Sequence, residues 1–162
     1  MVTPGRVGET TFATPSDREV VITRIVDAPR RLVFAAYTNP EHLPHWMLGP
    51  QGWTMPICEI DLRPGGAWRF VWRRADGTEM EMRGVYQEIV PPERLVSTES
   101  WGGDWPETLN TLVLSEEDGK TTITQRVLYA SKEARDAALK TGMTEGASQG
   151  FDRLDEYLAT MA

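Results

Sequence analysis

The apolar and polar positions near the start of the chain predict one strand followed by one helix. Residues 19–26 read Glu-Val-Val-Ile-Thr-Arg-Ile-Val, a β-branched run that favours a strand. Pro29 then begins a helix, in which apolar residues recur at helical spacing between residues 32 and 37, and Asn39-Pro40 ends it.

The middle of the chain alternates between apolar and polar residues and is divided by tight turns. Further strands are predicted over residues 55–62, 67–74, 78–90, 94–101, 107–115 and 120–129. Turn segments rich in Gly, Pro and Asp, such as residues 63–66 and 75–77, join several of these strands directly. The pattern therefore predicts an antiparallel meander.

The last third of the chain changes to helical spacing. Ser131 caps a short helix over residues 132–139, and residues 143–160 carry apolar side chains at spacings of three and four. Glycines crowd the first half of the second helix, although each costs a helix roughly 1 kcal/mol. Either close packing of the helix on the sheet or an apolar cavity explains them.

Two neighbouring strands each carry an apolar row on one face, which the alternation points inward. The rows are Trp68, Phe70 and Trp72 on the first strand and Met80, Met82 and Tyr86 on the second. Helices and strands are segregated along the chain, so we predict an α+β fold. In it a curved antiparallel sheet of about six or seven strands wraps around a long C-terminal helix, with two short helices after the first strand.

Polar side chains also occupy inward positions on two later strands. Glu99 follows Leu95 and Ser97 on one inward face, and Gln125 lies between Ile123 and Val127 on another. A buried carboxylate must be hydrogen-bonded, paired or protonated. Glu99 is therefore either a cavity acid that anchors a ligand, or a group that pairs with an arginine or lies at a rim open to water.

The segment EHLPHWMLGP (41–50) holds both histidines, His42 and His45. Pro44 lies between them and no third nitrogen or thiolate ligand is near, so no metal site is predicted. His45 stays an acid/base candidate because one imidazole suffices for proton transfer. The chain has no glycine-rich phosphate loop, nucleophile elbow or Cys/His cluster, so no cofactor is expected.

Length, charge and cysteine content limit the classes of protein that remain. The 162 residues suffice for one domain, which we place at residues 18–162 after a flexible lead-in over residues 1–17. A net charge of −7 argues against nucleic acid as a partner. The lone Cys58 fits a reducing compartment, and no segment is apolar and long enough for membrane insertion, so a cytoplasmic protein is expected.

Several motifs together resemble the bacterial activator-of-heat-shock-ATPase-homologue-like domains (AHSA1-type) of the START-like helix-grip (SRPBCC) superfamily, which also holds polyketide cyclases. The segments that carry the resemblance are VDAPRRLVF (26–34), TNPEHLPHW (38–46), GP (49–50), DLRPGG (61–66), VPPERLV (90–96), GMTEG (142–146) and FDRLDEYL (151–158).

The resemblance implies a curved sheet that grips the last helix around a hydrophobic cavity. It places Trp46 and Gly49-Pro50 near the entrance of that cavity. Many relatives have aromatic residues where this chain has Met47-Leu48, which implies a more aliphatic rim. The eukaryotic activators add a chaperone-binding domain that this chain lacks room for, so a chaperone partner is not expected.

Three hypotheses follow. The leading one is a protein that binds a small hydrophobic or aromatic molecule between the C-terminal helix and the sheet. The expected lining is Trp68, Phe70, Trp72, Met80, Met82, Tyr86, Met143, Ala147 and Phe151, with Trp46 at the mouth and Glu99 or Gln125 orienting a polar group. The first alternative is a polyketide-cyclase-like enzyme that uses Glu99 or His45. The second is a solid-core interaction module or homodimer without a ligand.

Overall fold

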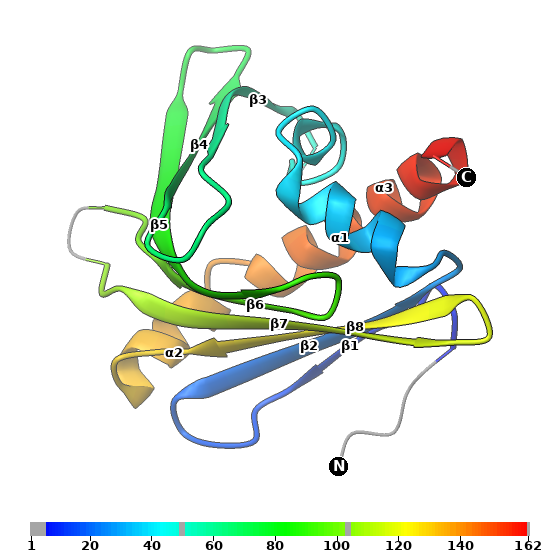
Figure 1. Cartoon of the computed structure of the whole chain (residues 1–162). Coiled ribbons are helices and arrows are strands. Elements are labelled where there is room, and N and C mark those ends of the chain that lie inside the picture. The colour runs from blue at the N-terminus through cyan, green and yellow to red at the C-terminus, as the bar shows by residue number, and fades with distance from the viewer. Residues whose placement is uncertain (1–5, 49–50, 103–104, 162) are drawn as a thin grey trace.

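Eight antiparallel strands form the sheet in the part of the chain that the structure, a computed structural model, describes: residues 6–48, 51–102 and 105–161 (Figure 1). Along the sheet their order is β1-β2-β8-β7-β6-β5-β4-β3. The strands are β1 (Thr10–Ala13), β2 (Glu19–Val26), β3 (Trp53–Ile60), β4 (Ala67–Arg74), β5 (Glu79–Val90), β6 (Arg94–Glu99), β7 (Thr108–Glu117) and β8 (Lys120–Leu128).

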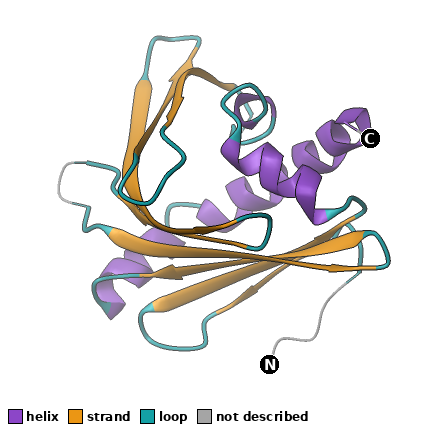
Figure 2. Cartoon of the chain, viewed as in Figure 1, coloured by secondary structure: helices purple, strands orange, loops and turns teal. Residues whose placement is uncertain are grey.

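The helices gather against one side of the sheet. They are α1 (Arg30–Thr38), the 3-10 helix η1 (Leu43–His45), α2 (Lys132–Leu139) and α3 (Met143–Met161). Figure 2 shows α1 and α3 in the angle between β3–β5 and the remaining strands. The predicted α+β class, the curved sheet and the long C-terminal helix are confirmed.

The sheet bends at Gly84 in the long strand β5. This strand pairs with β4 through residues 79–85 and with β6 from Tyr86 onward, where the register shifts. A Cβ at Gly84 would lie 1.9 Å from the carbonyl oxygen of Thr98 and 2.5 Å from the Trp68 ring. Only glycine lets the strands and the indole come this close, so Gly84 sets the curvature around the helices.

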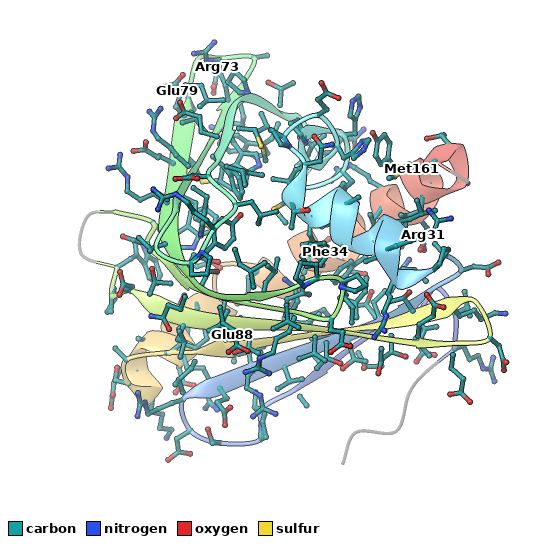
Figure 3. All side chains as sticks on the ribbon, viewed as in Figure 1. Arg31, Phe34, Arg73, Glu79, Glu88 and Met161 are labelled. Carbon is teal, nitrogen blue, oxygen red and sulfur yellow. The ribbon has the colours of Figure 1, made fainter. Side chains whose placement is uncertain are left out.

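The two faces of β3–β5 differ as the alternation predicts. Trp68, Phe70 and Trp72 are each 5% exposed on the inner face. The outer face carries ion pairs between arginines of β4 and carboxylates of its neighbours, such as Arg73 Nε to Glu79 Oε2 at 2.8 Å (Figure 3). These exposed pairs add little stability, but they keep the outer face polar.

The C-terminal helix α3 is held by packing and by one buried arginine. Its Phe151, Leu154 and Leu158 are nearly inaccessible, at 2%, 0% and 3% exposure. Arg24 of β2, itself 2% exposed, pairs with Asp152 at 2.9 Å and with Asp155. Charge and apolar burial therefore fix α3 to the sheet together.

Two details differ from the sequence analysis. Strand β1 lies inside the expected lead-in, where it pairs with β2 from Thr10↔Arg24 to Ala13↔Val21. Four residues of threonine-rich edge strand give too weak a pattern to predict. Second, Met80 is 39% exposed although it shares the parity of Met82 and Tyr86, because it lies at the open end of β5.

No helix among the described residues is both long and apolar enough to cross a membrane.

Candidate functional site

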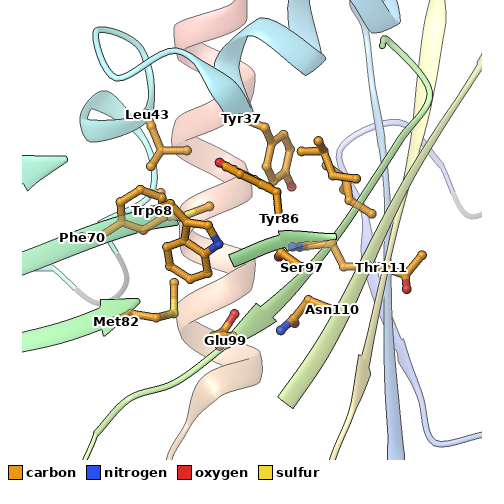
Figure 4. A pocket seen from close by; sticks show the side chains of 14 residues that line it. Tyr37, Leu43, Trp68, Phe70, Met82, Tyr86, Ser97, Glu99, Asn110 and Thr111 are labelled. Carbon is orange, nitrogen blue, oxygen red and sulfur yellow. The ribbon is translucent and has the colours of Figure 1, made fainter. Parts of the chain in front are cut away.

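A hollow of about 100 Å³ lies between the sheet and the segment that carries α1 and η1 (Figure 4). Residues from α1, the η1 segment and strands β4 to β8 line it. They are Tyr37, Leu43, Met47, Trp68, Phe70, Met82, Tyr86, Leu95, Ser97, Glu99, Asn110, Thr111, Leu112 and Gln125.

Six residues predicted from the sequence meet at this hollow. They are Trp68, Phe70, Met82, Tyr86, Glu99 and Gln125. The Trp68 and Phe70 ring centroids are 4.8 Å apart, so they form a continuous aromatic wall. The period-two alternation therefore identified the inner faces of four strands correctly.

Other residues proposed as lining lie elsewhere. Met80 is exposed, and the buried Trp72 stacks on Trp101 at 5.5 Å between centroids. On α3, Met143 accepts a hydrogen bond from the Tyr129 hydroxyl, while Ala147 and Phe151 belong to the packed interior. The described hollow thus has its roof in α1 and η1 rather than in α3, which corrects the expected place between the C-terminal helix and the sheet.

Trp46 lies in the core, which corrects its expected place at a cavity mouth. It is 3% exposed, and its indole N–H donates to the Ala36 carbonyl oxygen at 3.0 Å. The ring meets Tyr37 edge-on at 4.8 Å and stacks on Phe151 at 6.4 Å between centroids. The accompanying prediction for Gly49 and Pro50 concerns residues outside the described ranges.

Glu99 is the one carboxylate among the described lining residues. It is half-buried, and the Trp101 indole N–H donates to its Oε1 at 2.8 Å. Burial raises the pKa of the Glu99 carboxyl to about 7, an effect that the Trp101 hydrogen bond partly opposes. No ion pair among the described residues involves Glu99, so the structure does not show the predicted pairing with an arginine.

Two further lining residues hold polar atoms without partners. The Tyr37 hydroxyl and the Trp68 indole nitrogen are buried, and neither forms a hydrogen bond with a described residue. By contrast, the Asn110 side-chain amide donates to Thr108 Oγ1 at 3.0 Å. Buried polar groups are rarely left unpaired, so these two mark the hollow as a candidate binding site.

Both histidines contact Tyr157 and so join the η1 segment to α3. His42 Nδ1 and the Tyr157 hydroxyl are joined by a hydrogen bond of 2.6 Å, and the exposed His45 stacks on the Tyr157 ring at 4.8 Å. Neither histidine lines the hollow. Within the described ranges, no group of three His, Cys, Asp or Glu side chains could hold a metal ion.

Several lining residues were missed from the sequence. Ser97, Asn110 and Leu112 lie on inward strand positions, so the alternation that identified Glu99 could also have identified them. The strand alternation gives no such signal for Tyr37, Leu43 and Met47, which lie outside the strands. Their place above the sheet depends on how the segment after β2 folds back across it.

A curved antiparallel sheet gripping a C-terminal helix, with a hollow on its concave side, defines a helix-grip domain of the START-like class. The chain belongs to the family described as Activator of Hsp90 ATPase homolog 1-like protein, which matches residues 27–159.

Solved structures support the same assignment. A crystal structure of a Rhodobacter sphaeroides protein is 31% identical, covers 95% of this chain and 100% of that one, and has a TM-score of 0.88. A Mycobacterium smegmatis protein is 25% identical over 91% of this chain and 96% of that one, with a TM-score of 0.81. A Nitrosomonas europaea protein at 24% identity covers 91% and 98% of the two chains, also at 0.81, and shows the fold alone. No curated protein matches significantly.

Proposed function

We propose that this domain binds a small, largely apolar molecule in the hollow under α1 and η1. The observation that carries the proposal is the lining itself, in which Trp68, Phe70 and Leu112 contribute apolar surface and polar groups such as Glu99 lie among them. Ligand sites are typically apolar concavities with a few placed polar groups. The family and its superfamily provide the fold in which such binding is common.

The volume limits what fits. A cavity of roughly 150 Å³ holds benzene, so about 100 Å³ takes a molecule slightly smaller unless the walls move. Met47 and Met82 lie in those walls, and methionine side chains adapt their shape readily. Molecules slightly smaller than benzene therefore fit the hollow as it is. Larger aromatic ones require these two side chains to shift.

Calorimetry with a panel of small apolar and aromatic molecules tests the proposal. Met82→Trp should fill the hollow and abolish binding. Met80→Trp is the matched control, because Met80 lies two residues away on the same strand, is 39% exposed and does not line the hollow. Equal binding by both variants contradicts the proposed site, provided that circular dichroism shows both to be folded.

Glu99 supports a second candidate, the polyketide-cyclase-like enzyme with a cavity acid/base. Its carboxyl lines the hollow and has a pKa of about 7, which suits proton transfer near neutral pH. His45, the other candidate, does not line the hollow. A small β-diketone in deuterated buffer supplies the assay, since Glu99→Gln should slow exchange of its central protons about 100-fold without abolishing binding. An unchanged exchange rate removes this candidate.

A further inference from the structure

Two unsatisfied donors define the chemistry of the hollow. Trp68 is 5% exposed and Tyr37 is 7% exposed, and the Trp68 indole nitrogen and Tyr37 hydroxyl lack a hydrogen-bond partner among the described residues. An indole N–H can only donate, so its missing partner must be an acceptor. Figure 4 shows both rings at the hollow, contributed by different parts of the chain: β4 and α1.

The lining of the hollow disfavours ionic ligands, for a different reason for each sign of charge. The lining that the structure describes includes Glu99 but no lysine or arginine. A carboxylate ligand would therefore be buried beside an acid without a cation to balance it. An ammonium ligand would pair with the Glu99 carboxylate, but it would leave the Trp68 N–H without an acceptor, because an ammonium group only donates.

We propose that the ligand is an uncharged molecule whose oxygen, as in a ketone or an ester, accepts hydrogen bonds from the Trp68 indole and the Tyr37 hydroxyl. The inference rests on the proposed binding function and names the chemical class that the site selects. The hydrocarbon part of the ligand packs against Phe70, Leu95 and Met82, which also line the hollow. The two donors thus orient the oxygen, while the apolar walls accept the rest.

Four matched probes of about five to seven heavy atoms test the proposal, the smaller ones chosen for the volume of the hollow. They are cyclobutanone, methylenecyclobutane, cyclobutylamine and cyclobutanecarboxylate. Each is added to the full chain with nitrogen-15 in its tryptophans, and the indole signals are followed by NMR. Trp68→Phe assigns the Trp68 signal. We expect cyclobutanone to bind most tightly and to shift the Trp68 indole proton.

Removing one donor should weaken the binding of the ketone but leave the binding of the hydrocarbon nearly unchanged. Tyr37→Phe deletes a single hydroxyl, and we expect it to weaken cyclobutanone binding about tenfold and methylenecyclobutane binding less than twofold. Tyr157→Phe is the control, since it deletes a tyrosine hydroxyl that bonds His42 outside the hollow. It should leave both affinities unchanged.

The outcomes separate the two proposals. If methylenecyclobutane binds as tightly as cyclobutanone and the Trp68 signal does not move, apolar binding stands and the acceptor inference falls. Tighter binding of the amine or the carboxylate also overturns the inference alone. If none of the four probes binds, both the inference and the proposed function fall.

Discussion

At the scale of single residues, Trp46 ties the connector between α1 and β3 into the core. Its ring touches one residue of α1 and one of α3, and its indole N–H caps the Ala36 carbonyl. Replacing Trp46 should therefore lower the stability of the whole fold rather than change ligand access alone.

Trp46→Ala should therefore lower the free energy of unfolding by about 3 to 5 kcal/mol, because it leaves a large cavity and an unpaired carbonyl. Denaturation in guanidinium chloride measures this. Trp105→Ala is the control, since Trp105 is 46% exposed and should change stability by no more than about 0.5 kcal/mol. Similar losses for both tryptophans contradict the burial of Trp46.

Glu99 makes stability depend on pH. Its pKa is about 7 in the folded chain and near 4.5 when unfolded, so the folded state holds the proton longer. Ionisation of Glu99 therefore lowers the free energy of unfolding as pH rises from about 4.5 to 7. The full loss is present above pH 7.

Glu99→Gln removes that penalty, so the variant should gain about 2 kcal/mol relative to the parent between pH 4.5 and pH 8. Urea denaturation of both proteins at the two pH values measures the difference. Glu59→Gln serves as the control because Glu59 is exposed on β3. A Glu99→Gln effect that is the same at both pH values contradicts the raised pKa.

At the scale of elements, three glycines differ in how strongly the structure requires them. Gly84 permits close contact between β5, the Trp68 ring and the Thr98 carbonyl. Gly150 lies within α3, where an added Cβ would meet the Trp46 carbonyl oxygen at an ordinary 3.7 Å. Gly142 has φ +82 at the turn before α3, a conformation that favours glycine.

Gly84→Ala should therefore destabilise the protein by at least about 2 kcal/mol, since backbone and ring must both move, whereas Gly150→Ala should stabilise it by up to about 1 kcal/mol through helix propensity. Thermal and chemical denaturation of the two variants provide the comparison. Equal effects of the same sign show that the close packing at Gly84 does not set the bend of the sheet.

At the scale of the whole molecule, Arg24 connects the sheet to α3. It pairs with two carboxylates one helical turn apart, and its side chain also donates to Thr10 Oγ1 at 2.7 Å. Three separate segments of the chain, β1, β2 and α3, thus meet at one buried guanidinium.

Arg24→Ala should cost about 3 kcal/mol of unfolding free energy, because it removes a buried, packed side chain together with its hydrogen bonds to Thr10 and to two carboxylates of α3. Arg126→Ala is the matched control, since that arginine is 51% exposed in its pair with Glu19 and should cost less than about 1 kcal/mol. Denaturation at low and high salt distinguishes the two, because screening weakens the exposed pair more. A small loss for Arg24→Ala means that α3 is held by apolar packing alone.

The sequence predicted most of the fold because strands and helices leave periodic signals. Seven of the eight strands, the Ser131 cap and the long last helix follow from alternation, helical spacing and turn residues. The same alternation predicted the inward orientation of six residues that line the hollow, among them Glu99 and Gln125. Strand β1 escaped because four edge residues carry too little pattern.

The sequence by itself determined which faces of the strands point inward, since a period of two leaves no other choice once one face is apolar. Only the tertiary structure decided what covers those faces. The segment after β2 brings Tyr37, Leu43 and Met47 over the hollow, whereas Phe151 of α3 packs in the core and does not line it. Such contacts depend on long-range packing between elements, which periodicity along the chain does not encode.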